Sequence, residues 1–121
     1  MTISSKLRMS CILTIDIAHP PLSAEQAETV LDESSRAVDR SSQSRILKII
    51  HGYGSSGKGG MLKTTVQNWT YRHRTEFRAI IDGEDASPFD PDIQRMAAEC
   101  NLSIQSDIGT ANNGITIIWV K

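Results

Sequence analysis

A glycine-rich segment from His51 to Gly60 has residue types well suited to binding an anion. It reads HGYGSSGKGG and lies between a strand expected over Arg45–Ile50 and an amphipathic helix expected over Gly60–His73. Glycine adopts a positive φ without a Cβ clash, so successive backbone N–H groups can point at one phosphate, and a helix N-terminus adds further donors. We call residues 51–60 the glycine loop and predict that it binds phosphate. The alternative is a flexible connection, although a plain connector needs one or two glycines and this segment has five.

Further side chains that could do chemistry follow the same two strands. Asp16 and His19 lie at the end of a strand expected over Met9–Ile17, and His51 follows the strand that leads into the glycine loop. A strand–helix–strand unit is nearly always right-handed with parallel strands, so both strand ends should share the sheet edge where ligands bind. Imidazole transfers protons near neutral pH, a carboxylate acts as a base or holds a divalent ion, and Lys58 would stabilise charge on phosphorus.

We therefore predict Asp16, His51 and His19 as catalytic residues for phosphodiester cleavage, with a divalent cation such as Mg²⁺ as an optional cofactor. For each residue there is a structural alternative. Asp16 would cap a turn, His19 would lie on the surface, and His51 would hydrogen-bond the loop backbone.

The charge distribution also points to the glycine loop. The chain has a net charge of −1, but residues 43–80 carry +6, whereas residues 1–42 carry −2 and residues 81–121 carry −5. A basic stretch beside a phosphate-binding loop is typical of nucleic-acid binding, so we predict DNA or RNA as the partner. The alternative is a solvated helix face. The predicted nucleic-acid-binding residues are Arg45, Gly52, Tyr53, Gly54, Gly57, Lys58, Gly60, Lys63, Arg72 and Arg74. Aromatic residues are too sparse to distinguish DNA from RNA.

The remaining sequence predicts an α/β fold in which strands and helices alternate. We expect a two-layer sandwich with a mixed sheet, in the order βαβαβ(α)β, and with helices packed against the sheet. Residues 1–10 form a tail, and residues 11–121 form a single domain. Residues 83–108 form an acidic insertion whose short helix begins at Asp90-Pro91 and should lie away from the glycine loop, since its carboxylates would repel phosphate. The other expected elements are a capping-box helix from Ser23 and strands at Phe77–Ile81, Leu102–Ile104 and Ile115–Val120.

The two cysteines and the N-terminal region bear on the compartment. Cys11 and Cys100 show no metal-ligand spacing, and we predict two buried thiols in a reducing cytosol. The apolar run Met9–Ile17 is interrupted by polar residues, so it is neither a signal peptide nor a membrane span. We therefore expect a cytoplasmic protein.

The motifs at both strand ends resemble those of the small MutS-related (Smr) domain family. That family has a strand ending in Leu-Asp-Leu-His or Leu-Asp-Leu-Arg, and a second strand ending in His-Gly-x-Gly or Thr-Gly-x-Gly with further glycines. The next helix carries a Leu-Arg or Leu-Lys pair and a Trp-Leu. The resemblance covers about Ile12 to Val120. Its matching positions are Ile15-Asp16-Ile17, His51-Gly52-Tyr53-Gly54, Gly57-Lys58-Gly59-Gly60, Leu62-Lys63, Trp69 and the closing strand Gly114–Val120.

The resemblance implies a compact α/β sandwich, nucleic-acid binding and, in several members, nicking or cleavage of DNA or RNA. Asp16 matches the aspartate of the first motif, and His51, Gly52 and Gly54 match the second. The position after Ile17 departs from the family, because it holds Ala18 instead of His or Arg. The pair Pro20-Pro21 also lengthens the turn, which leaves His19 as the candidate substitute, and the segment 83–108 is longer than the family pattern.

A nucleotide P-loop is a rival interpretation, because Gly52–Lys58 fits the spacing G-x-x-x-x-G-K. The next residue is Gly59, where a P-loop needs the Ser or Thr that holds magnesium, so nucleotide hydrolysis is disfavoured. The sequence thus predicts an Smr-like endonuclease that cleaves or nicks phosphodiesters. Two alternatives remain open: a non-catalytic module that binds nucleic acid or a ribosome, and a structural partner-binding domain in which the basic stretch is incidental.

Overall fold

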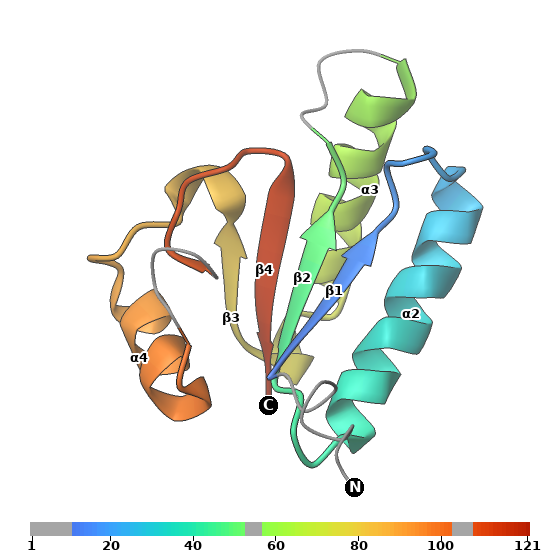
Figure 1. Cartoon of the computed structure of the whole chain (residues 1–121). Coiled ribbons are helices and arrows are strands. Elements are labelled where there is room, and N and C mark those ends of the chain that lie inside the picture. The colour runs from blue at the N-terminus through green and yellow to red at the C-terminus, as the bar shows by residue number, and fades with distance from the viewer. Residues whose placement is uncertain (1–10, 53–56, 103–107) are drawn as a thin grey trace, which may run out of the picture.

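A mixed four-stranded sheet forms the centre of the fold (Figure 1). The computed structural model describes residues 11–52, 57–102 and 108–121, and for residues 57–59 it describes the backbone alone. The strand order is β1-β2-β4-β3, in which β1 and β2 are parallel and β4 is antiparallel to both of its neighbours. The strands are β1 (Ile12–Asp16), β2 (Ile46–Ile50), β3 (Phe77–Asp82) and β4 (Ile115–Val120). The parallel β1–β2 pair confirms the prediction that both strands end at one edge.

Local capping chemistry sets the starts of two of the helices, α2 (Ala24–Arg40) and α4 (Pro91–Cys100). Ser23 Oγ accepts a hydrogen bond from the Gln26 backbone N–H, and Gln26 Oε1 accepts one from the Ser23 N–H, which confirms the capping box. Asp90 accepts from the first backbone N–H groups of α4. These donors have no partner inside the helix, so both starts were readable from sequence.

The helices cover both faces of the sheet. On one face, α2 and α3 (Gly57–Arg72) pack against strand residues such as Ile49 and Ile118. On the other face, α4 packs against Ile117 and Trp119 (Figure 1). The α/β class with a mixed sheet is therefore confirmed, and α2 and α3 form the helical layer of the expected sandwich. The acidic segment adds α4 on the opposite face, beside β3 and away from the start of α3, as predicted for its helix. At the start of the same segment, however, Glu84 reaches Lys63 of α3.

Some element boundaries differ from the expected ones. The helix expected from Gly60 begins at Gly57, so the second half of the glycine loop belongs to α3. The first strand is shorter than Met9–Ile17, because Ile17 lies beyond its end. Leu102 belongs to none of the described strands, and the rest of the strand expected there falls in 103–107, outside the described residues. The tail of residues 1–10 also lies outside them.

The prediction of two free thiols is wrong, because Cys11 and Cys100 form a disulfide. Their Cα atoms are 5.7 Å apart, within the ordinary range for such a bond, although the residues are 89 positions apart in sequence. The bond joins the residue before β1 to the last residue of α4. The expectation of a reducing compartment rested on two free thiols, so the disulfide removes the support for it. None of the helices in the described part of the chain has the length and apolarity of a membrane span.

Candidate functional site

Asp16 and His19 form a hydrogen-bonded pair where β1 ends. Asp16 Oδ1 accepts hydrogen bonds from the backbone N–H groups of Ala18 at 2.8 Å and His19 at 3.1 Å. Asp16 Oδ2 lies 2.9 Å from His19 Nδ1. The turn is closed by the Leu22 N–H, which donates to the Ile17 carbonyl at 2.9 Å. The structure thus brings together two of the three predicted catalytic residues, with a carboxylate holding one ring nitrogen of an exposed imidazole.

The hydrogen bonds of Asp16 define the protonation state of its carboxyl group. Slight burial raises the pKa of Asp16, but the hydrogen bonds from Ala18 and His19 outweigh it, so the pKa lies below its ordinary value. The carboxylate is therefore ionised at neutral pH and accepts the Nδ1–H of His19. In the neutral ring Nε2 then carries the lone pair. The side chain of His19 is 72% exposed, so this nitrogen is accessible to a substrate.

His51 has a different environment, although it follows the neighbouring strand. The residue is 1% exposed. Its Nδ1–H donates to the Gly52 carbonyl at 2.7 Å, and its Nε2 accepts from the Thr116 hydroxyl at 2.9 Å. Burial lowers the pKa of His51, and the hydrogen bond to Gly52 offsets only part of this effect. A neutral ring therefore ties the start of the glycine loop to β4. This is the loop-backbone contact that was the alternative to a catalytic role.

A cavity of about 300 Å³ opens beside His19 and Gly52. Its remaining lining comes from the end of β2 and the turn before β4: Ile50, Asn112, Gly114 and Ile115. The Gly114 carbonyl accepts from the N–H of His51 at 2.9 Å and of Gly52 at 3.0 Å, which fixes the turn against the loop. Sequence reasoning did not assign this turn to the site. The run Asn112-Asn113-Gly114 signalled a turn, but only the placement of β4 beside β2 brings it to this edge.

The structure describes the two ends of the glycine loop, residues 51–52 and 57–60. Gly52 has φ +85°, a left-handed value that disfavours residues with a Cβ, so this position requires glycine for the turn. Gly57 and Gly60 lie in the first turn of α3, whose early N–H groups have no partner inside the helix. Tyr53, Gly54 and the side chain of Lys58 lie outside the described residues. Their predicted contacts with nucleic acid stay predictions.

Among the predicted basic residues whose side chains the structure describes, Arg45, Arg72 and Arg74 do not lie around the loop. Arg45 does not lie around the loop as expected, because it comes just before β2, at the opposite end of that strand, and its contact with nucleic acid stays a prediction. Its guanidinium donates to the carbonyls of Val38, Ser41 and Lys121, so it caps the end of α2 instead. Arg45 is close to the glycine loop in sequence, but the five residues of β2 between them span about 16 Å.

The remaining described cations lie along α3. Arg72 forms an ion pair with Glu28 at 2.7 Å, and Arg74 lies over the Tyr71 ring at 4.0 Å. Arg72 is the last residue of α3 and Arg74 comes two residues later, so both lie at the far end of a helix about 24 Å long. Lys63 is nearer the loop, with Nζ 3.7 Å from a Glu84 carboxylate oxygen. A nucleic-acid strand that met all of these cations would have to follow the helix.

The described residues form no group of three or more His, Cys, Asp or Glu side chains that could hold a metal ion. At the edge where β1 and β2 end, the candidate metal ligand is the Asp16 carboxylate. Its oxygens already accept hydrogen bonds from Ala18 and His19. Mg²⁺ favours an octahedral set of oxygen ligands. This donor set does not fit Mg²⁺, and we assign no step to a metal.

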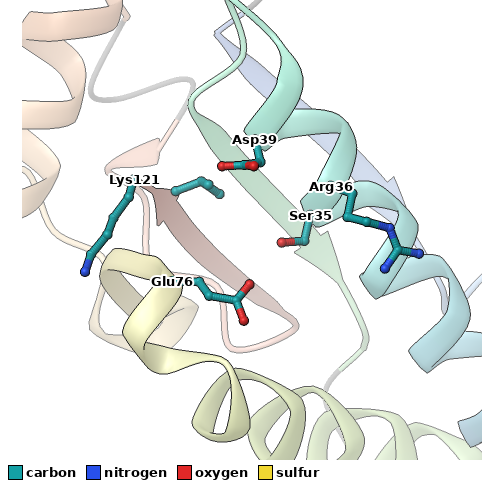
Figure 2. A pocket seen from close by; sticks show the side chains of 6 residues that line it. Ser35, Arg36, Asp39, Glu76 and Lys121 are labelled. Atoms are coloured by element: carbon teal, nitrogen blue, oxygen red, sulfur yellow. The ribbon is translucent and has the colours of Figure 1, made fainter.

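A second cavity of about 260 Å³ lies at the opposite end of the sheet (Figure 2). Its lining has side chains of both charges and includes none of the predicted site residues. The lining residues are Ser35, Arg36, Asp39, Glu76, Val120 and Lys121. The edge that holds Asp16, His19 and Gly52 is therefore the better candidate site.

The fold and this edge define a class of protein: a mixed α/β domain with a cavity where its two parallel strands end. Open α/β sheets bind ligands at such edges. Comparisons of the chain with protein-family models, curated proteins and solved structures found no match.

Proposed function

We propose that this chain is an Smr-like domain that binds DNA or RNA and cleaves its phosphodiester bonds. The observation that carries the proposal is the 2.9 Å contact between His19 Nδ1 and Asp16 Oδ2, on a residue that lines the cavity beside Gly52. The motif resemblance supports the same class, because Asp16, His51 and Gly52 occupy the matching positions.

The chemistry follows from the orientation of His19. Its Nε2 is the general base that removes a proton from the attacking oxygen. That oxygen forms a bond to phosphorus as the bond from phosphorus to the leaving oxygen breaks, and the leaving oxygen takes a proton from water. The Asp16 carboxylate holds Nδ1 and stabilises the imidazolium that results. Negative charge that develops on phosphorus is stabilised by the N–H groups that open α3. His51 positions the glycine loop in this scheme and does not itself transfer a proton.

A non-catalytic binding module is the second candidate function. It is favoured by the burial of His51, whose ring nitrogens both have protein partners, and by Ala18, which stands where the family motif has His or Arg. In that case the sheet edge with Asp16, His19 and Gly52 binds a phosphate of the nucleic acid but does not cleave the phosphodiester bond.

The decisive experiment measures binding and cleavage together. Labelled single-stranded RNA, duplex DNA and supercoiled plasmid are incubated with the protein, with and without Mg²⁺, across a salt series. If two to four phosphates are neutralised, log K falls against log salt with a slope of roughly −1.5 to −3.5. Cleavage that is lost in His19→Ala supports the nuclease, and binding without cleavage supports the module. No binding at low salt, or a slope near zero, contradicts both.

A further inference from the structure

We infer that the cavity beside His19 and Gly52 receives one unpaired nucleobase, and that Asn112 donates a hydrogen bond to it. The substrate class is then single-stranded nucleic acid. This inference rests on the proposed function and narrows its substrate.

The size and walls of the cavity fit a base. Its volume is about 300 Å³. At about 30 Å³ per water this is room for roughly ten waters, which is enough to admit a flat ring system the size of one nucleobase. Ile50 and Ile115 are directly paired on the neighbouring strands β2 and β4, and both line the cavity. Ile50 is partly exposed, so its apolar side chain suits the flat face of a base, whereas Ile115 is 7% exposed and supports it from the core. A stacked duplex would have to extrude that base, at a cost of a few kcal/mol, whereas a single strand presents it freely.

Asn112 supplies the polar group that orients the base. Its Oδ1 accepts the Gly114 backbone N–H at 2.9 Å, which sets the orientation of the amide. The NH₂ group, with two donors, is then the part left for a ligand. The Asn112 backbone is also held, because its N–H donates to the Gly83 carbonyl at 2.8 Å and its carbonyl accepts the Ile115 N–H at 3.3 Å. A fixed donor beside the apolar side chain of Ile50 favours a base edge that presents a carbonyl oxygen or an unprotonated ring nitrogen.

The position of the cavity connects base binding to cleavage. His19 lines the cavity as well as contacting Asp16. A base seated against Ile50 therefore brings its own sugar-phosphate next to the imidazole. Base insertion then positions the scissile phosphodiester, which is how remote binding contributes to the rate of a reaction.

Short oligonucleotides on the full chain test the inference. Fluorescence anisotropy compares a single strand, the same strand with one central abasic site, and the matching duplex. Loss of the stacked base should weaken binding of the abasic strand by roughly tenfold, and the duplex should bind more weakly than the intact single strand. Equal affinity for the intact and abasic strands overturns the inference while leaving nucleic-acid binding in place. Absence of binding to all three overturns the proposed function, and this inference with it.

A pair of charge-matched variants tests the role of Asn112. Asn112→Asp keeps an oxygen for the Gly114 N–H but removes both donors, whereas Asn113→Asp makes the same change at an exposed neighbour outside the cavity lining. We expect roughly ten- to a hundredfold weaker binding of the intact strand for Asn112→Asp, and less than about threefold for Asn113→Asp. Asn112→Asp should also lose the preference for the intact over the abasic strand. Equal losses in the two variants overturn the role of Asn112. If Asn112→Asp does not fold, the abasic comparison on the unaltered chain decides.

Discussion

The imidazole of His19 is joined to the carboxylate of Asp16 across a three-residue turn, with Nδ1 at 2.9 Å from Oδ2. Two backbone N–H groups from the same turn also reach this carboxylate. The pair is therefore preorganised by local hydrogen bonds, and one ring nitrogen is directed away from its carboxylate partner. His73 and Glu76 have a similar spacing, with Nδ1 at 2.8 Å from Oε2, but they lie at the opposite end of the sheet.

We first predict that His19→Ala lowers phosphodiester cleavage by roughly 10²–10⁴-fold and leaves binding nearly unchanged, because a general base acts mainly in the transition state. Initial rates and anisotropy, measured on the same substrate, separate the two effects. His73→Gln is the matched control and should leave cleavage within about twofold. Cleavage that depends on His51 but survives in His19→Ala would reverse the assignment and restore the catalytic role that the sequence suggested for His51.

The disulfide leads to a second prediction. Replacement of both Cys11 and Cys100 by serine should lower the free energy of unfolding by about 2–4 kcal/mol, because the cross-link closes a long loop in the unfolded chain. Urea unfolding measures the change. A reductant should destabilise the unaltered chain by a similar amount and leave the double variant unaffected. If the reductant changes nothing, both cysteines are free thiols in solution.

Gly83 is the basis of a third prediction. A Cβ at Gly83 would lie 1.9 Å from the Asn112 backbone oxygen and 2.6 Å from that of Ile115. Both atoms belong to the backbone, so the turn before β4 would have to move. Gly83→Ala should therefore lower the free energy of unfolding by about 3 kcal/mol or more. The comparison is Gly52→Ala, which has room for a Cβ but a strained φ, and should cost about 1–2 kcal/mol. The reverse order in urea unfolding would contradict this account.

Local chemistry explains which parts of the fold could be predicted. The caps at Ser23 and Asp90 act within a few residues, and the structure has both. The handedness rule for strand–helix–strand units placed Asp16 near the end of β2, since it depends on chain chirality alone.

Long-range placement explains what could not be predicted. No local pattern brings Cys100 to Cys11, because their contact depends on where α4 docks. The Asn112 turn joins the site only because β4 lies between β2 and β3, and the sequence did not determine that strand order. Arg45 shares a charge cluster with the glycine loop in sequence, but β2 separates the two along its full length. The burial of His51 also depends on a β4 partner, Thr116.

The buried ring of His51 gives a final prediction, on the pH dependence of stability. Its pKa is lowered in the folded state by burial, whereas in the unfolded chain it returns to about 6.5. Above that value the ring is neutral in both states and contributes no pH dependence. As the pH falls below it, the unfolded chain binds the proton more readily, so the free energy of unfolding decreases until the folded ring also becomes protonated. Urea unfolding between about pH 8 and pH 5 should show this loss, and His51→Gln should show a shallower one, since glutamine does not titrate there. Identical pH profiles for the two proteins would mean that the His51 ring is accessible to protons in the folded state, and would return it to the set of candidate proton-transfer residues.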